Sequence, residues 1–156
     1  MDRIIEAVDD GFRVGLGPNE RAAIRRLAGQ HRELLTAENP SSDPAVARLF
    51  PSAYPDDPLR SLEFEEATGG VLLDGRLQAA ATVESTADAE VLTEEQLLQW
   101  LAVINDLRLV LGIRLELTEE TTEADFAGDD ERAGSYDLYV FLTWLESEII
   151  DVLPVS

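Results

Sequence analysis

Few side chains in this sequence have types and spacing suited to chemistry, and His31 comes first because it is the single histidine. A Ser-His-Asp arrangement, or a metal site that uses histidine, would need this residue. Its neighbours at helical spacing are apolar, namely Ile24, Leu27, Leu34 and Leu35. That position favours a hydrogen-bonded core histidine over a catalytic base.

Adjacent carboxylates are the second group with chemical potential, and they occur at Asp56-Asp57, Glu94-Glu95, Glu119-Glu120 and Asp129-Asp130. None of these pairs has the ligand spacing of an EF-hand calcium loop. Neighbouring side chains also point in different directions, so a pair does not form an acid–base couple. We expect solvated acidic surface, with no catalytic residue, no cofactor and no metal site.

The basic residues Arg21, Arg25 and Arg26 lie close together on a predicted helix. Helical spacing brings them near Glu20 and Glu33, and such ion pairs are common on a solvated face. The sequence therefore predicts an exposed basic patch without a specific ligand.

The most informative polar residues lie inside an apolar segment, 93–117, around which we expect the rest of the chain to pack. Thr93 and Gln96 have the spacing of a capping box, which marks a helix start. The following residues are apolar nearly all round the helix, as is typical of a helix buried among others. Asn105, Asp106 and Arg108 interrupt this apolar run.

Arg108 is predicted to point toward the packed side, near Trp100, with Asn105 on the same face. A buried guanidinium needs a partner, whereas Asp106 points elsewhere. The candidate partners on other helices are Glu63, Glu66, Asp137 and Glu146. Two interpretations remain open: a structural network of Asn105, Arg108 and Trp100, or a pocket for an anionic ligand or for a partner's carboxylate.

The charge and composition of the chain argue against several classes of function. The formal net charge is −20, and no residue is cysteine. Disulfides and thiol chemistry are excluded, and we expect no nucleic-acid binding, because affinity for phosphate needs cationic contacts. No apolar stretch has the length of a membrane span and the N-terminus is acidic, so we expect a cytoplasmic protein without a membrane partner.

Sequence periodicity predicts a mainly α, single-domain helical bundle of about five helices over residues 1–156, with a small N-terminal β-hairpin. A kink or break is expected at Thr68-Gly69-Gly70, and residues 113–117 are read as helix, with a third strand as the alternative. Residues 118–130 are expected to form an acidic loop. The predicted elements are a hairpin at about 4–16 and helices at about 18–37, 44–50, 57–85, 93–116 and 131–153.

Four stretches of the chain resemble one actinobacterial family, the domain of unknown function two-zero-one-seven. They are AVINDLRLVLGIRL, ARLFPSAYPDDPLRSLEFEEAT, GPNERAAIRRLAGQHRELL and YDLYVFLTWLE. The resemblance implies a gene neighbourhood beside the Clp-protease adaptor ClpS, and some members carry the label of transcriptional regulator. It implies no activity and no catalytic residues.

We therefore expect a non-catalytic binding or regulatory protein that acts through a protein partner. A homodimer through an exposed apolar part of the central or last helix is an alternative. A transcriptional regulator is the second hypothesis, although no helix is strongly basic. An enzyme without a recognisable motif is the third.

Overall fold

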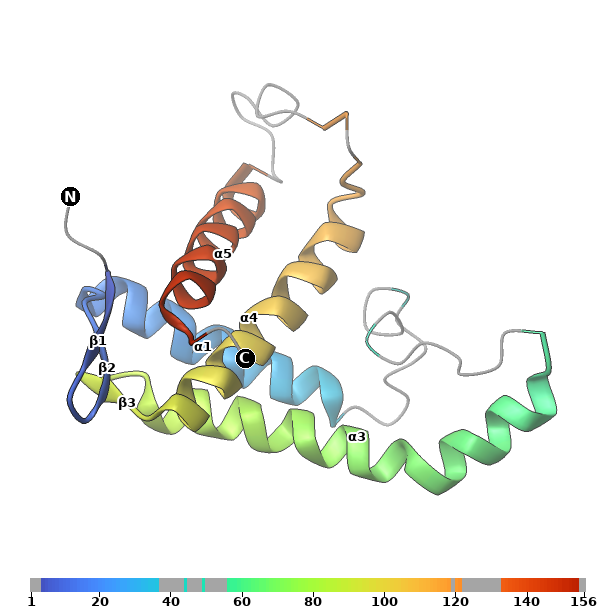
Figure 1. Ribbon diagram of the computed structural model, residues 1–156. Helices are drawn as coiled ribbons and strands as arrows, with labels where there is room; N and C mark the ends of the chain where they lie inside the picture. The colour runs from blue at the N-terminus through green and yellow to red at the C-terminus, as the bar shows by residue number, and fades with distance from the viewer. Residues whose placement is uncertain are drawn as a thin grey trace.

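The computed structural model describes residues 4–36, 44, 49, 56–118, 120–121 and 133–154 (Figure 1). Within these ranges the protein is mainly α-helical with a small antiparallel sheet, as predicted. Four helices are described rather than about five, since the predicted helix 44–50 falls almost wholly outside the described residues, as does most of 118–130. The elements are β1 (Ile5–Val8), β2 (Gly11–Val14), α1 (Pro18–Leu35), α3 (Pro58–Thr86), β3 (Val91–Leu92), α4 (Glu94–Arg114) and α5 (Ala133–Val152).

The N-terminal hairpin is confirmed, and it gains a third strand that the sequence did not reveal. β2 lies between β1 and β3, and Phe12 pairs with Leu92. A Cβ atom at Gly11 would lie 2.2 Å from the carbonyl oxygen of Leu92, so glycine permits this close approach. β3 escaped prediction because two residues are too short to show a strand period.

The alternative strand at 113–117 does not form. α4 continues to Arg114, and Leu115 remains in a right-handed helical conformation as the C-cap. Glu116 then adopts a φ of 56°, which ends the helix. The preferred prediction, a helix to about Glu116, extends two residues beyond the observed end of α4 at Arg114.

α4 begins as its sequence predicts. The Thr93 hydroxyl accepts a hydrogen bond from the Gln96 amide at 3.1 Å, and the Gln96 side chain accepts one from the Thr93 amide at 3.0 Å. Both bonds satisfy amides that have no partner inside the helix. The capping box therefore sets where α4 starts.

Among the helices that the structure describes, α4 is the one that has the length and apolar composition of a membrane span. A core helix of a folded domain has the same properties, and α4 packs against α3 and α5 (Figure 1). Its buried apolar side includes Leu97, Trp100, Val103 and Ile104. Of the apolar stretch in α4, 33% is buried inside the protein.

α3 is unbroken at Thr68-Gly69-Gly70, so of the expected kink or break, the break is wrong. Helical residues continue on both sides, and each added residue contributes a further backbone hydrogen bond once the helix exists. That propagation outweighs the roughly 2 kcal/mol that two glycines cost. Figure 1 shows the axis of α3 bending along its N-terminal half.

The main hydrophobic core lies where the sheet and the four helices meet. Its fully buried members come from every one of these helices and from all three strands. They include Ile5, Val14, Ile24, Ala28, Ala80, Val83, Leu92, Leu97, Trp100, Ile104, Leu142, Leu145 and Ile149.

Arg21 connects α1 to the sheet through four backbone carbonyls. Its Nε donates to Leu16 O at 2.9 Å and its Nη2 to Val14 O at 2.6 Å. Its Nη1 donates to Ala87 O at 3.0 Å and to Ala89 O at 2.7 Å. The prediction of an exposed patch is therefore wrong for Arg21, because these carbonyls come from segments far apart in the sequence.

We expect Arg21→Ala to lower the free energy of unfolding by about 2–4 kcal/mol, because partly buried carbonyls lose a charged donor. Urea denaturation followed by circular dichroism measures this change. Arg26→Ala is the matched control, since Arg26 is exposed on the same helix, and its effect should stay within about 0.5 kcal/mol. Equal effects of the two substitutions would contradict the role of Arg21.

Candidate functional site

Asp106 of α4 is a buried carboxylate, 5% exposed, that binds side chains from two other helices. Its Oδ1 accepts a hydrogen bond from Arg76 Nη1 of α3 at 2.5 Å. Its Oδ2 lies 3.2 Å from His31 Nε2 of α1. The Arg76 guanidinium also donates to Leu49 O at 2.9 Å. One carboxylate thus joins α1, α3 and α4, and its charge is compensated where water is excluded.

His31 is the core histidine that the sequence predicts, 1% exposed and hydrogen-bonded to Asp106. Because an ionised carboxylate only accepts hydrogen bonds, Nε2 carries the proton that lies between them. The other ring nitrogen, Nδ1, is buried without a hydrogen-bond partner in the part of the chain that the structure describes. Of the two ring nitrogens of His31, Nε2 therefore has a hydrogen-bond partner among the described residues and Nδ1 has none.

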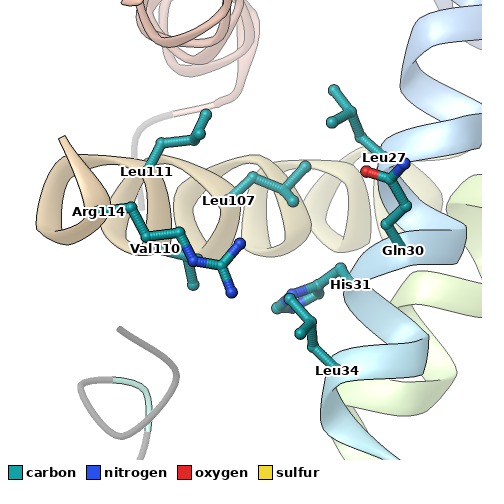
Figure 2. A pocket seen from close by; sticks show the side chains of 8 residues that line it. All are labelled: Leu27, Gln30, His31, Leu34, Leu107, Val110, Leu111 and Arg114. Carbon is teal, nitrogen blue, oxygen red and sulfur yellow. The ribbon is translucent and has the colours of Figure 1, made fainter. Parts of the chain in front are cut away.

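The ring of His31 lines a pocket of about 80 Å³ between α1 and α4 (Figure 2). Its walls are mostly aliphatic, and Gln30 and Arg114 are exposed residues of its lining. In Figure 2 the guanidinium of Arg114 and the ring of His31 point toward one another. The lining residues are Leu27, Gln30, His31, Leu34, Leu107, Val110, Leu111 and Arg114.

The burial of Asp106 was not predicted, although the sequence contains a signal for it. Asp106 follows Val103 by three residues and precedes Val110 by four, and both valines are buried. This spacing places Asp106 on an inner side of α4. Arg76 could not be found in the same way, because its pairing depends on how α3 crosses α4.

Arg108 takes its partner from α5. Its Nη1 forms an ion pair with Glu146, one of the four predicted candidates, and its Nε donates to Thr143 Oγ1 at 3.0 Å. The guanidinium carbon also lies 5.4 Å from the centre of the Tyr139 ring. These contacts balance the charge of Arg108 without an external ligand. Of the other candidates, Asp137 is exposed, and the side chains of residues 63 and 66 lie outside the described part.

The structure does not bring Asn105, Arg108 and Trp100 together as one network. Asn105 is exposed on α4. Trp100 is fully buried, and its Nε1 donates to Thr86 Oγ1 at 2.7 Å. Each of the three residues faces a different part of the protein, so a shared pocket around Arg108 has no support from their positions.

Exposed apolar side chains gather on α4 and α5. Of the eight large hydrophobic residues that are exposed within the described ranges, six belong to these two helices. Leu109 and Trp144 each follow, in the sequence, one of the two residues Arg108 and Thr143 whose side chains join the helices. We call this surface the α4–α5 face: Leu98, Leu109, Ile113, Val140, Trp144 and Ile150.

The α4–α5 face has an acidic border. α5 carries Asp137, Glu148 and Asp151 in addition to Glu146, which is paired with Arg108, and it has no basic residue. Among the described residues no three histidine or carboxylate side chains lie together as a metal-ligand group. The described surface thus combines apolar and acidic groups.

Comparison with known proteins finds a family and named relatives. A family model described as domain of unknown function (DUF2017) matches residues 2–153. The chain is 30% identical to the oxidative stress regulator AosR of Mycobacterium tuberculosis, with 93% of this chain and 83% of that protein covered. The same values hold for AosR of Mycobacterium bovis. No solved structure matches the chain.

We expect Asp106→Ala to lower the free energy of unfolding by about 3–5 kcal/mol, because Arg76 and His31 both lose their carboxylate. Urea denaturation measures the change. Asp137→Ala, at an exposed position on α5, is the control and should change stability by less than about 0.5 kcal/mol. A loss below about 1 kcal/mol for Asp106→Ala would show that this carboxylate does not hold the helices together.

Proposed function

The chain belongs to the DUF2017 family, and we propose that it is a non-catalytic regulatory protein that binds a protein partner through the α4–α5 face. That membership confirms the resemblance carried by AVINDLRLVLGIRL and the three other stretches. The observation that supports the proposal is the concentration of exposed apolar side chains on two adjacent helices. Single exposed apolar residues are ordinary, whereas a group of them marks an interaction surface.

The chemistry of the partner follows from the charge around this face. The chain has a net charge of −20, and α5 contributes three acids, Asp137, Glu148 and Asp151, beside Glu146, which pairs with Arg108. A partner segment that is apolar and bordered by basic residues would bury the hydrophobic side chains of the α4–α5 face. Its basic residues would then contact the acids around that face. Opposite charges also raise the rate of encounter, more so at low salt.

The named relatives suggest the process in which the chain acts. They are oxidative stress regulators, and we extend that role to this protein. These 156 residues contain no cysteine, so a thiol switch in this system would have to belong to the partner. The cytoplasm is the proposed location. Components of Clp proteolysis are the first partners to test, given the gene neighbourhood that the family resemblance implies.

Direct binding to DNA is the second candidate, because the relatives are named regulators. Several arginines that could contact phosphate already face carboxylates of the same chain. Arg25 pairs with Asp88, and Arg32 Nε donates to Glu84 at 2.9 Å. The hydrogen bond that Arg32 donates to Glu84 raises the pKa of Arg32. Regulation through a protein partner is therefore the preferred mechanism.

We expect the double substitution Leu109→Glu with Trp144→Glu to weaken partner binding at least about tenfold, because it puts charge into the apolar centre of the interface. A photoreactive amino acid at position 109 captures the native partner from lysate, and titration with the purified partner gives the affinity. Leu59→Glu is the control, since Leu59 is 68% exposed on α3.

Two results would overturn this surface assignment. One is unchanged affinity of the double variant for the purified partner. The other is an equal loss in Leu59→Glu, which would indicate a general effect of added charge. If the crosslinked species is a dimer of this chain, the occupant is a second copy rather than a basic partner.

We expect no measurable binding of the pure protein to duplex DNA at physiological salt, because a charge of −20 opposes contact with phosphate. Fluorescence anisotropy with labelled duplexes, over a series of salt concentrations, measures it. Sequence-selective binding that weakens as salt rises would support the transcription hypothesis instead.

A further inference from the structure

The outward side of α4 presents a regular stripe of exposed residues. They follow one another at steps of three and four, so they lie along one side of the helix. The same steps form the seam that one helix presents to another in a coiled coil. The members of the stripe are Leu98, Ala102, Asn105, Leu109 and Ile113.

The outward side of α5 carries a second stripe with the same spacing. Val140, Trp144 and Ser147 are exposed at steps of four and three. Asp137 and Asp151, both exposed, continue the stripe at its two ends. These two acids are separated by about 21 Å along the axis, because a helix rises about 1.5 Å per residue.

α4 and α5 run in opposite directions, side by side (Figure 1). A Cβ atom at Gly112 would lie 3.9 Å from the Tyr139 ring. Arg108, one turn earlier on α4, binds Thr143 and Glu146, which come later on α5. Earlier positions on one helix therefore meet later positions on the other.

This antiparallel arrangement brings the two stripes to the same side of the helix pair. Arg108 and Thr143 face one another, since the arginine Nε donates to the hydroxyl at 3.0 Å. Leu109 comes one residue after Arg108, and a step of one residue turns about 100° around the axis. Trp144 comes one residue after Thr143 by the same step. Because the helices are antiparallel, both steps lead to one side, whereas in a parallel pair they would lead to opposite sides.

A surface of two adjacent helical stripes matches a third helix. Side chains at steps of three and four interdigitate with those of a helix that has the same steps. A β-strand has a period of two residues, so its side chains do not follow this spacing. A strand also binds through the backbone of an open sheet edge, whereas the backbone groups of α4 and α5 are paired within their own helices.

Asn105 specifies one position of the occupant. It lies in the middle of the α4 stripe, between Ala102 and Leu109. An apolar side chain opposite Asn105 would bury the amide without a hydrogen-bond partner, which costs free energy. In coiled coils a single polar residue of this kind fixes the register of the partner helix. The side chain opposite Asn105 must therefore form hydrogen bonds.

The acids at the ends of the α5 stripe specify the charge of the occupant. Asp137 and Asp151 favour basic residues at both ends of a partner helix that spans about four turns. A second copy of this chain would bring the same acids and a further charge of −20 to the surface, so electrostatic repulsion disfavours it.

We propose that the α4–α5 face binds an amphipathic α-helix with basic residues at both ends of its apolar stripe and an amide side chain opposite Asn105. The inference rests on the proposed function for the location of the surface. It adds the conformation of the partner segment, its charge pattern and its register. An extended segment and a second copy of this chain are the other occupants to be tested.

Two synthetic peptides of about 21 residues, or three heptads, test the conformation. Both contain the same leucines and lysines with one central asparagine, and they differ only in order. In the first peptide the leucines follow steps of three and four, and in the second leucine alternates with lysine. The full chain is titrated with each fluorescent peptide at physiological salt, which screens unspecific attraction between opposite charges.

We expect the peptide with helical order to bind at least about tenfold more tightly than the alternating peptide. Its ¹³Cα shifts should move to helical values on binding. The double substitution Leu109→Glu with Trp144→Glu should remove this difference between the peptides. Leu59→Glu, on α3, should retain it, because Leu59 lies outside both stripes.

A third peptide, with leucine in place of the central asparagine, tests the register. We expect the native protein to bind it at least about threefold more weakly than the asparagine peptide, because the Asn105 amide loses its partner. Asn105→Leu should reverse this preference. A residue that only maintains the fold would weaken both peptides alike.

Each contrary result has a distinct meaning. Equal binding of both orders, lost in the double variant, would overturn the helical occupant and leave the surface assignment intact. Binding that the double variant does not weaken would overturn the surface assignment together with the helix. A dimer of the free chain in sedimentation, dissociated by the double substitution, would assign the face to a second copy. Absence of binding by every peptide at hundreds of micromolar would also overturn the proposal.

Discussion

The fold depends on a charge that must be neutralised inside the protein. Asp106 lies in an apolar helix, and a lone carboxylate there would be too costly. Arg76 from α3 and His31 from α1 meet it, so three helices are brought to one point by hydrogen bonds of defined direction. Apolar contacts are tolerant of small rotations, whereas this arrangement is not. The polar cluster thus specifies how the helices sit relative to one another.

The orientation of α4 links the interior of the protein to its surface. Asp106 faces α1 and α3, and Arg108 faces Thr143 and Glu146 of α5. With both polar residues engaged, the remaining side of the helix exposes Leu98, Leu109 and Ile113. The pairing of Asp106 and Arg108 inside the protein thus fixes the rotation of α4, and this rotation leaves apolar side chains exposed. The same orientation leaves His31 and Arg114 on either side of a small pocket.

The surface and composition together favour regulation through contact with another protein. The relatives are named for the control of oxidative stress, but this chain has no thiol with which to sense an oxidant. An acidic protein with an apolar face is suited to hold a basic segment of a partner.

The sequence alone determined the N-terminal hairpin and the long helices, because their signals are local. The capping box at Thr93 and Gln96, the turn at Gly11 and the helical periodicities all act between near neighbours. It also placed His31 in the core and named Glu146 among the partners of Arg108. Only the tertiary structure decided that Asp106 pairs with Arg76, that Arg21 joins four carbonyls, and that Val91–Leu92 extends the sheet. These contacts join residues far apart in the chain, and their partners are set by the crossing of helices, which no local pattern encodes.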